Sequence, residues 1–220
     1  MLADNSERAR FNMIAQQVRP VEVIDERVLD AMAQVPREDF VPEAYRGVAF
    51  ADVIVPLAGG QAMMKPLQEA RMLQALEVQP GDSVLEIGTG SGFVTACLAR
   101  LGSDVTSYEL DKELADAAAA RLADQGVTNA RVLHGDGLAA EAPEGGYAAI
   151  AVTGSLPCYD KRLDSLLAPG GRLFVVVGEA PVMEAMLVRR DDNGAIAREN
   201  LFETEVPALR NAPRPDGFAF

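Results

Sequence analysis

The sequence predicts an α/β fold in which a mostly parallel sheet is doubly wound by helices, and three observations carry this expectation. From Asp82 onward, short apolar segments rich in β-branched residues alternate with helical segments, as is typical of a parallel sheet. A glycine-rich turn at 88–92 follows the first of these segments and opens a helix. Near the end of the chain, turn residues at 191–194 separate two strand-like segments. Together these features indicate a Rossmann-like core that ends in a C-terminal β-hairpin and follows an N-terminal helical extension.

The extension is predicted to contain three helices. The first begins at a capping box formed by Asp4 and Glu7 and ends before Pro20. The second follows Asp25, and the third begins at Pro66, a residue favoured in the first turn of a helix. An irregular, aromatic-bearing connection joins the second helix to the third. The residues expected on the buried faces are Phe11, Ile14, Ala15 and Val18; Val28, Leu29, Met32 and Val35; and Leu67, Ala70, Leu73 and Leu76.

Three stretches organise the chain: the helical and substrate-loop extension over 1–80, a cofactor-binding core over 81–210, and an extended tail over 211–220. Within the core, β-branched and aromatic residues predict strands, and glycine and proline mark the turns between them. The predicted strands are 83–87, 104–109, 130–134, 148–152 and 172–177, the helices are 91–101, 112–125 and 159–167, and the hairpin arms are 182–190 and 195–206.

The first turn of the core has the pattern acid-x-Gly-x-Gly-x-Gly, which starts at Glu86. A bare turn needs one or two glycines, so three at alternate positions favour a loop that a ligand approaches closely. The spacing differs from the Gly-x-Gly-x-x-Gly fingerprint of dinucleotide sites. It resembles motif I of the class I S-adenosylmethionine-dependent methyltransferases. That resemblance implies that Glu86 addresses the cationic methionine end of the cofactor, lined by Gly88, Gly90 and Gly92. The alternative is a tight turn without a ligand.

Two further acids follow later strands. Glu109 ends the second strand, 21 residues after Gly88, where an acid is placed to accept hydrogen bonds from the hydroxyls of a ribose. Because NAD and S-adenosylmethionine share that ribose, Glu109 indicates an adenosine ligand without choosing between them. The methyltransferase resemblance places Asp136 near the exocyclic amine of adenine, with Gly137 leaving room for the ring. The alternative is that Asp136 and Gly137 form an ordinary turn.

Composition excludes several other classes of function. The chain has 33 Asp and Glu against 20 Lys and Arg, a net charge of −13 and 5% aromatic residues, which argues against a nucleic-acid partner. No apolar run is long enough to cross a membrane and no signal peptide is recognisable, so we expect a cytoplasmic protein without a membrane partner. Two cysteines and one histidine without ligand spacing indicate no metal site.

Beyond the glycine loop, the chain resembles the protein-L-isoaspartate O-methyltransferase family from near residue 10 to near residue 210. The resemblance implies an enzyme that transfers a methyl group from S-adenosyl-L-methionine, leaving S-adenosyl-L-homocysteine, to carboxylates of damaged proteins or peptides with isoaspartyl residues. It rests on Phe11-Asn12-Met13 with Gln16-Gln17, the string Val35-Pro36-Arg37-Glu38-Asp39-Phe40-Val41-Pro42, the loop Leu85-Glu86-Ile87-Gly88-Thr89-Gly90-Ser91-Gly92, the string Leu167-Ala168-Pro169-Gly170-Gly171-Arg172-Leu173, and Glu205-Val206-Pro207-Ala208-Leu209.

One segment departs from the family pattern. Where the family has Gly-Gln-Thr-Ile-Ser-Gln-Pro, with a serine hydroxyl beside the methyl-accepting carboxylate, this chain has Ala62 for the threonine, Met64 for the serine and Lys65 for the second glutamine. A thioether is only a weak acceptor and cannot replace a hydroxyl that donates to a carboxylate. Losing a hydrogen bond to a charged group costs about 1.5–3 kcal/mol, a factor of about ten to a hundred in rate or affinity. The expected acceptor-side residues are Gln61, Met64 and Thr153.

Other functions remain open at this point. The apolar residues of 62–64 are compatible with a related methyltransferase whose acceptor is a small, more apolar molecule. A protein that binds S-adenosylmethionine without turnover, as a sensor or assembly factor, would keep the same loop and Glu109. An NAD-dependent oxidoreductase is the weakest alternative, because the glycine spacing differs from its fingerprint. The sequence does not indicate an oligomeric state.

Overall fold

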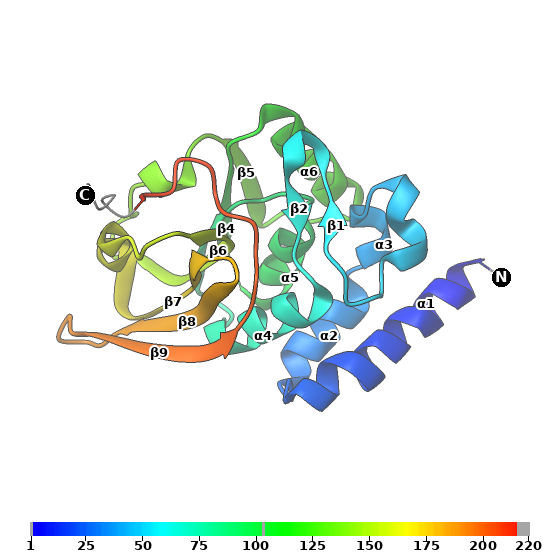
Figure 1. Ribbon diagram of the computed structural model, residues 1–220, viewed down its shortest axis with the longest axis horizontal. Coiled ribbons are helices and arrows are strands. Elements are labelled where there is room, and N and C mark those ends of the chain that lie inside the picture. The colour runs from blue at the N-terminus through cyan, green and yellow to red at the C-terminus, as the bar shows by residue number, and fades with distance from the viewer. Residues whose placement is uncertain (1, 103, 215–220) are drawn as a thin grey trace.

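A seven-stranded sheet organises the chain in the computed structural model, which describes residues 2–102 and 104–214 (Figure 1). Its order is β5-β4-β3-β6-β7-β8-β9, and the pairings from β5 through β7 are parallel whereas β8 and β9 are antiparallel. The predicted Rossmann-like α/β class is therefore confirmed. The strands are β3 Ser83–Ile87, β4 Asp104–Glu109, β5 Ala130–His134, β6 Tyr147–Leu156, β7 Leu167–Glu179, β8 Val182–Arg190 and β9 Ile196–Glu203.

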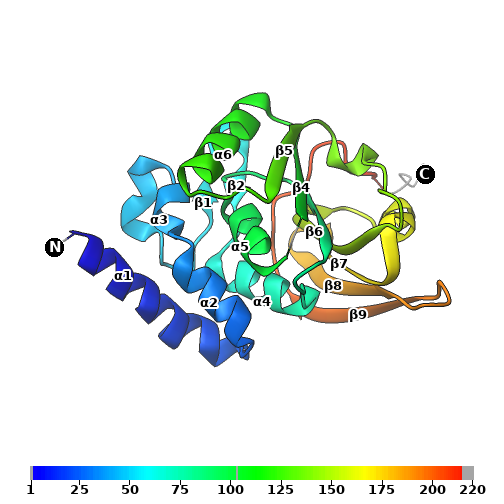
Figure 2. The same cartoon turned by 180° about the vertical axis from the view of Figure 1, so that it is seen from behind.

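The two faces of the sheet carry different covers, because alternate residues of each strand point to opposite sides. On one side lie α4 (Pro66–Leu76), α5 (Phe93–Leu101) and α6 (Lys112–Asp124), with α2 (Glu26–Gln34) packed on α4 and α5 (Figure 2). Val84 and Phe174 belong to the hydrophobic core on this side. Leu85 and Leu173 belong to the core on the other side, which is covered by the short 3₁₀ helices η5 (Gly137–Ala139) and η6 (Lys161–Leu166).

The predicted helix over 159–167 is wrong in type and length, since η6 is a 3₁₀ helix of six residues. Its buried leucines, Leu163 and Leu166, lie three residues apart, which matches the three-residue repeat of a 3₁₀ helix. Asp160 caps the element by accepting a hydrogen bond from the backbone of Arg162. The other two core helices begin and end within two residues of the predicted bounds.

The first helix differs from prediction at both ends. It begins at Leu2 and runs to Met13 as α1, so Asp4 lies inside it and is not an N-cap. The chain then continues as a π-helix over Ile14–Val18 and a 3₁₀ helix over Arg19–Val21 that contains Pro20. Phe11, expected in the core, is 67% exposed, because it lines an open groove between α1 and α2 rather than a closed helix contact.

The second and third helices are confirmed as α2 and α4, with Asp25 as the N-cap of α2 and Pro66 in the first turn of α4. Between them lie α3 (Arg37–Phe40), the 3₁₀ helices η3 (Glu43–Val48) and η4 (Ala58–Gly60), and a small antiparallel pair that was not predicted. This pair joins β1 (Val55–Pro56) to β2 (Ala62–Met63). Of the residues that depart from the family pattern, Ala62 therefore lies in the hairpin, whereas Met64 and Lys65 connect it to α4.

The predicted C-terminal hairpin is confirmed as β8 and β9, closed by the turn at 191–194. After β9 the chain runs back past the carboxyl end of β6, where Ser155 donates to Pro207 O at 2.9 Å and accepts from Leu209 N at 2.9 Å (Figure 1). Of the predicted tail, 215–220 lies outside the described residues, and the division into three stretches stays a prediction. No helix among the described residues is long and apolar enough to cross a membrane.

Candidate functional site

The glycine loop lies at the carboxyl end of β3, at the point where the strand order reverses between β4 and β6. Parallel α/β sheets bind ligands at such switch points. Gly88 has φ +99°, and a Cβ placed there would lie 2.5 Å from Thr153 Oγ1. The backbone N–H groups of Gly88 and Thr89 both donate to Tyr108 O, at 2.9 and 3.2 Å. The loop is therefore fixed against both neighbouring strands, β4 and β6.

Glu109 connects the end of β4 to the same loop. Its carboxylate accepts a hydrogen bond from Gly90 N at 2.8 Å and another from Asp111 N at 3.0 Å. The side chain is buried yet lines a small cavity beside the loop. Each carboxylate oxygen can accept more than one hydrogen bond, so both retain capacity for the hydroxyls of a ligand.

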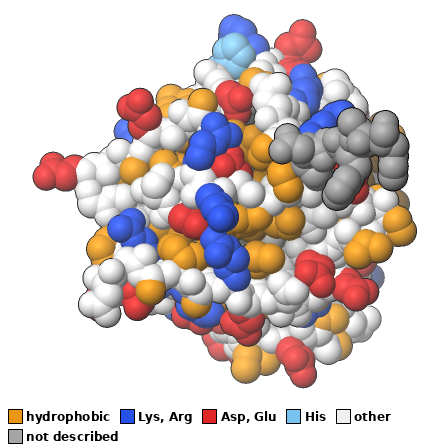
Figure 3. Space-filling view, turned by 60° about the vertical axis from the view of Figure 1, so that its left-hand side comes forward, with side chains coloured by type: hydrophobic (Ala, Val, Ile, Leu, Met, Phe, Trp, Pro, Cys, Tyr) orange, Lys and Arg blue, Asp and Glu red, His pale blue; other side chains and the backbone are white. Residues whose placement is uncertain are grey.

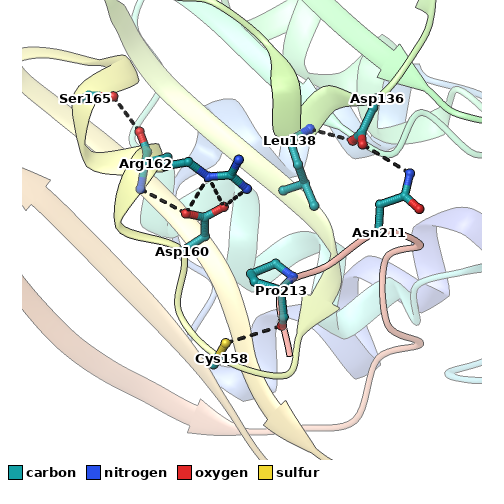
Figure 4. Close-up of polar contacts among 8 residues, drawn as sticks. All are labelled: Asp136, Leu138, Cys158, Asp160, Arg162, Ser165, Asn211 and Pro213. Atoms are coloured by element: carbon teal, nitrogen blue, oxygen red, sulfur yellow. Dashed lines mark hydrogen bonds and ion pairs between the residues drawn. The ribbon is translucent and has the colours of Figure 1, made fainter. Parts of the chain in front are cut away.

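Asp136 begins the short helix η5 and faces the same cavity. One carboxylate oxygen accepts from Leu138 N at 3.0 Å, and the other accepts from the side-chain amide of Asn211 at 3.2 Å (Figure 4). The absence of a side chain at Gly137 has a packing cause, because a Cβ there would lie 2.7 Å from Ile87. The predicted role of Gly137 in leaving room for an adenine ring is a separate proposal.

The cavity beside Glu109 and Asp136 measures about 50 Å³. The C-terminal segment closes it through Leu209 and Arg210, and Cys158 Sγ donates to Pro213 O further along this segment (Figure 4). Gln61 lies across the cavity. With its amide oriented so that both groups have partners, its oxygen accepts from Arg210 Nε at 3.1 Å. The cavity is lined by Gln61, Ile87, Gly88, Tyr108, Glu109, Leu110, Gly135, Asp136, Gly137, Leu138, Leu209 and Arg210.

A second cavity, of about 30 Å³, lies on the other side of the glycine loop. Met64 and Thr153 line it, and so does Gly88, which therefore lies between the two cavities. The hydroxyl of Thr153 donates to Ile87 O and Gly88 O, so it holds the loop and has no second proton to offer an acceptor. The lining consists of Ala62, Met63, Met64, Glu69, Gly88, Thr89, Gly90, Ser91, Val94 and Thr153.

Glu86 lies beneath the loop and lines neither cavity. It is fully buried, and one of its oxygens accepts from the hydroxyls of Thr95 and Ser107. Its other oxygen has no hydrogen-bond partner among the described residues. Burial raises the pKa of Glu86 to about 8, although both hydroxyls lower it. The expected contact of Glu86 with a cationic methionine end stays a prediction.

The structure thus brings together all but two of the predicted residues around two adjoining cavities. The exceptions are Glu86, which lies beneath the loop, and Gly92, which lies at the start of α5. Sequence reasoning missed the contributions of Leu209, Arg210 and Asn211. Leu209 ends a string that resembles the family, but nothing in that string indicates that the segment returns to the cofactor loop, more than a hundred residues earlier in the chain. Sequence reasoning placed Glu69 in the helix that begins at Pro66 and did not predict that it lines the acceptor cavity. Among the described residues, no group of three or more His, Cys, Asp or Glu could hold a metal ion.

Comparison with known proteins assigns this arrangement to a family. The family model for protein-L-isoaspartate(D-aspartate) O-methyltransferase matches residues 9–210. A protein-L-isoaspartate O-methyltransferase of Koribacter versatilis is 39% identical over 203 residues, which is 92% of this chain and 91% of the relative. One from Methanoculleus marisnigri is 41% identical over 192 residues, which is 87% of each chain.

The fold agrees with these matches. A crystal structure of a protein-L-isoaspartate O-methyltransferase from Plasmodium falciparum, in complex with S-adenosyl-L-homocysteine, superposes with a TM-score of 0.79 at 22% identity, covering 93% of this chain and 98% of the other. The family match also confirms the predicted enzyme class, an S-adenosylmethionine-dependent O-methyltransferase. This chain belongs to the protein-L-isoaspartate(D-aspartate) O-methyltransferase family.

Proposed function

We propose that this chain methylates the free carboxylate of isoaspartyl residues in proteins or peptides. The observation that carries the proposal is the position of Gly88 between two cavities. One cavity ends at the carboxylates of Glu109 and Asp136, and the other ends at Met64. A methyl donor held in the first and an acceptor held in the second would meet beside the loop. Family membership supports the choice of donor and acceptor.

The residues of the first cavity fit S-adenosylmethionine. When bound, the cofactor supplies an electrophilic methyl group on a sulfonium ion. In our proposal Glu109 accepts hydrogen bonds from the ribose, and Asp136 accepts one from the adenine amine. Gly88 and Gly90 let the backbone approach the methionine end, because no side chain projects from them. The cavity of about 50 Å³ is smaller than the roughly 300–1,000 Å³ typical of ligand pockets, and Gln61, Leu209 and Arg210 form its outer side.

The acceptor chemistry needs little from the protein beyond orientation. A carboxylate is ionised at neutral pH and attacks the methyl group itself, so no general base is required. In our proposal Gln61, Met64 and Thr153 border the acceptor. Met64 is 5% exposed and offers an apolar surface in place of the family hydroxyl. We expect turnover that is lower than with the hydroxyl by a factor of about ten to a hundred.

A protein acceptor also agrees better than a nucleic acid with the charges on the surface. The net charge is −13. On the face that Figure 3 shows, basic side chains gather with acidic ones beside them. Two of the arginines near η6 are engaged in ion pairs, Arg162 with Asp160 at 2.6 Å and Arg198 with Asp164 at 2.7 Å. Paired arginines leave less positive charge for phosphates.

A second candidate function follows from the same cavity. Ala62, Met63 and Met64 line the acceptor side, and both methionines are 5% exposed. An apolar lining would also suit a small acceptor with less charge than a carboxylate. The cofactor side would be unchanged in that case.

Transfer of labelled methyl groups to an isoaspartyl peptide tests the proposal, with the matched aspartyl peptide as the control acceptor. We expect base-labile methyl ester on the isoaspartyl peptide alone. Gly88→Ala should abolish it, because the added Cβ would lie 2.5 Å from Thr153 Oγ1, whereas Gly47→Ala, with no atom within 4 Å of the added Cβ, should not. Equal labelling of both peptides would contradict the proposal. Methylation of apolar small molecules instead would favour the second candidate, and cofactor binding without any product would indicate a sensor.

A further inference from the structure

The side chain of Arg37 lies behind the acceptor cavity and connects four segments of the fold. It is fully buried, with 0% of its side chain exposed. Its Nε donates to Ala49 O at 2.9 Å, one terminal nitrogen pairs with the carboxylate of Glu69, and the other donates to Met64 O at 3.0 Å. Its guanidinium carbon lies 4.7 Å from the centre of the Phe93 ring. All three nitrogens are therefore engaged.

Two of these contacts reach the proposed site directly. Met64 and Glu69 line the acceptor cavity, on the segment after β2 and on α4 respectively. Phe93 is the first residue of α5, immediately after the glycine loop. The planar guanidinium thus spans from the acceptor side of the site to the element that follows the cofactor loop. A lysine could not reproduce this contact set, because its donors radiate from a single nitrogen.

We propose that Arg37 is a positioning residue for the acceptor: by holding the Met64 carbonyl against Phe93 and Glu69, it fixes the acceptor segment 62–65 relative to the glycine loop. This proposal rests on the proposed methyl transfer. Arg37 lines neither cavity, so it acts through Met64 and not through contact with a ligand. Misplacing a reacting group by about 1 Å lowers a rate by about a hundredfold.

The glycine loop has anchors that do not involve the contact between Arg37 and Met64. The glycine loop is held by the carboxylate of Glu109 and by Tyr108 O, both from β4. Replacing Arg37 should therefore change turnover while leaving cofactor affinity nearly unchanged. If the role of Arg37 were purely structural, its replacement would lower thermal stability, and turnover and cofactor affinity would either both fall or both stay unchanged.

The test compares Arg37→Lys with Arg10→Lys. Arg10 is a matched control, since it is 11% exposed, pairs with Glu38 at 2.6 Å, donates to Ala33 O at 2.8 Å, and lines neither cavity. We expect both variants to melt at lower temperature. Arg37→Lys alone should lower kcat with an isoaspartyl peptide about 10- to 100-fold, with the Kd of S-adenosylmethionine within about threefold of wild type. It should also speed amide hydrogen exchange in 62–65.

Unchanged kcat and exchange in Arg37→Lys, an equal loss of kcat in Arg10→Lys, or a loss confined to cofactor affinity would overturn the proposal. If Arg37→Lys does not fold, the double variant Arg37→Gln with Glu69→Gln removes both charges of the pair together and leaves no unpaired buried ion. Because Glu69 itself lines the acceptor cavity, the readout for this variant is amide hydrogen exchange in 62–65, which should be faster since glutamine is too short to reach Met64 O. If wild type does not methylate the isoaspartyl peptide, the proposed acceptor fails, and hydrogen exchange in 62–65 alone decides the role of Arg37.

Discussion

Restoring the family hydroxyl at position 64 gives the sharpest test of why this acceptor side differs. Met64→Ser places a hydroxyl at the edge of the acceptor cavity, beside Thr153 and Gly88. A hydrogen bond from that hydroxyl to a carboxylate is worth about 1.5–3 kcal/mol. We therefore expect kcat/KM for an isoaspartyl peptide to rise about 10- to 100-fold. The Thr153 hydroxyl cannot supply this hydrogen bond in the wild type, because it already donates to the backbone of the loop.

The same substitution should cost stability. Met64 is 5% exposed and belongs to the hydrophobic core on the helical side of the sheet. Removing most of a buried methionine side chain costs about 2–5 kcal/mol. For a chain of this size, each kcal/mol lowers Tm by about 2–4 °C. Met64→Ser should thus be a faster and less stable enzyme.

Steady-state kinetics with the isoaspartyl peptide and thermal denaturation measure the two effects. Met72→Ser is the control, since Met72 is fully buried in the same core but lines neither cavity. It should lose stability without gaining activity. An unchanged or lower kcat/KM in Met64→Ser, while it remains folded at the assay temperature, would refute the reasoning and favour an acceptor other than a carboxylate.

Three further predictions concern the cofactor side. Glu109→Gln removes the charge that accepts hydrogen bonds, so calorimetry should show S-adenosylmethionine bound about 10- to 100-fold more weakly. Asn211→Ala frees an oxygen of Asp136 and should tighten binding about two- to tenfold in the same assay. Because burial raises the pKa of Glu86 from 4.5 to about 8, the folded chain keeps a proton that the unfolded chain releases, and the free energy of unfolding falls as pH rises between those values. Urea titrations between pH 4.5 and about 8 should show a smaller fall in the free energy of unfolding for Glu86→Gln than for wild type.

The core could be predicted from sequence because its signals are local. The bounds of β3, β4 and β5 coincide with those predicted, since each strand is a short β-branched segment closed by glycine or an acid. β6 and β7 extend beyond their predicted ends into residues 153–156 and 167–171, where Thr153 is the one β-branched residue and Pro169, Gly170 and Gly171 resemble a turn. Local patterns also gave the β8–β9 hairpin through its turn residues.

What could not be predicted depends on contacts between distant residues. Helical spacing placed Phe11 in the core, but whether α1 closes onto α2 is decided by packing, and there it leaves a groove. Arg210 and Asn211 reach the site through the return of the chain along β6, which no motif announces. The sequence pattern likewise treats Glu86 and Glu109 as two acids near one ligand, whereas burial separates their environments.

The contacts that hold the glycine loop indicate how a family member can change its acceptor side and keep its cofactor side. Glu109 holds Gly90 from β4, and Thr153 holds Gly88 from β6, so the loop has its shape without help from 62–64. Ala62 is held by the pairing of β2 with β1, and Met64, just after β2, is held by Arg37. Because separate contacts fix the two sides, substitutions on the hairpin alter acceptor chemistry without redesigning the loop. Met64→Ser should therefore change kcat/KM while leaving the Kd of S-adenosylmethionine where it was, and a matching change in Kd would show that the two sides are one unit.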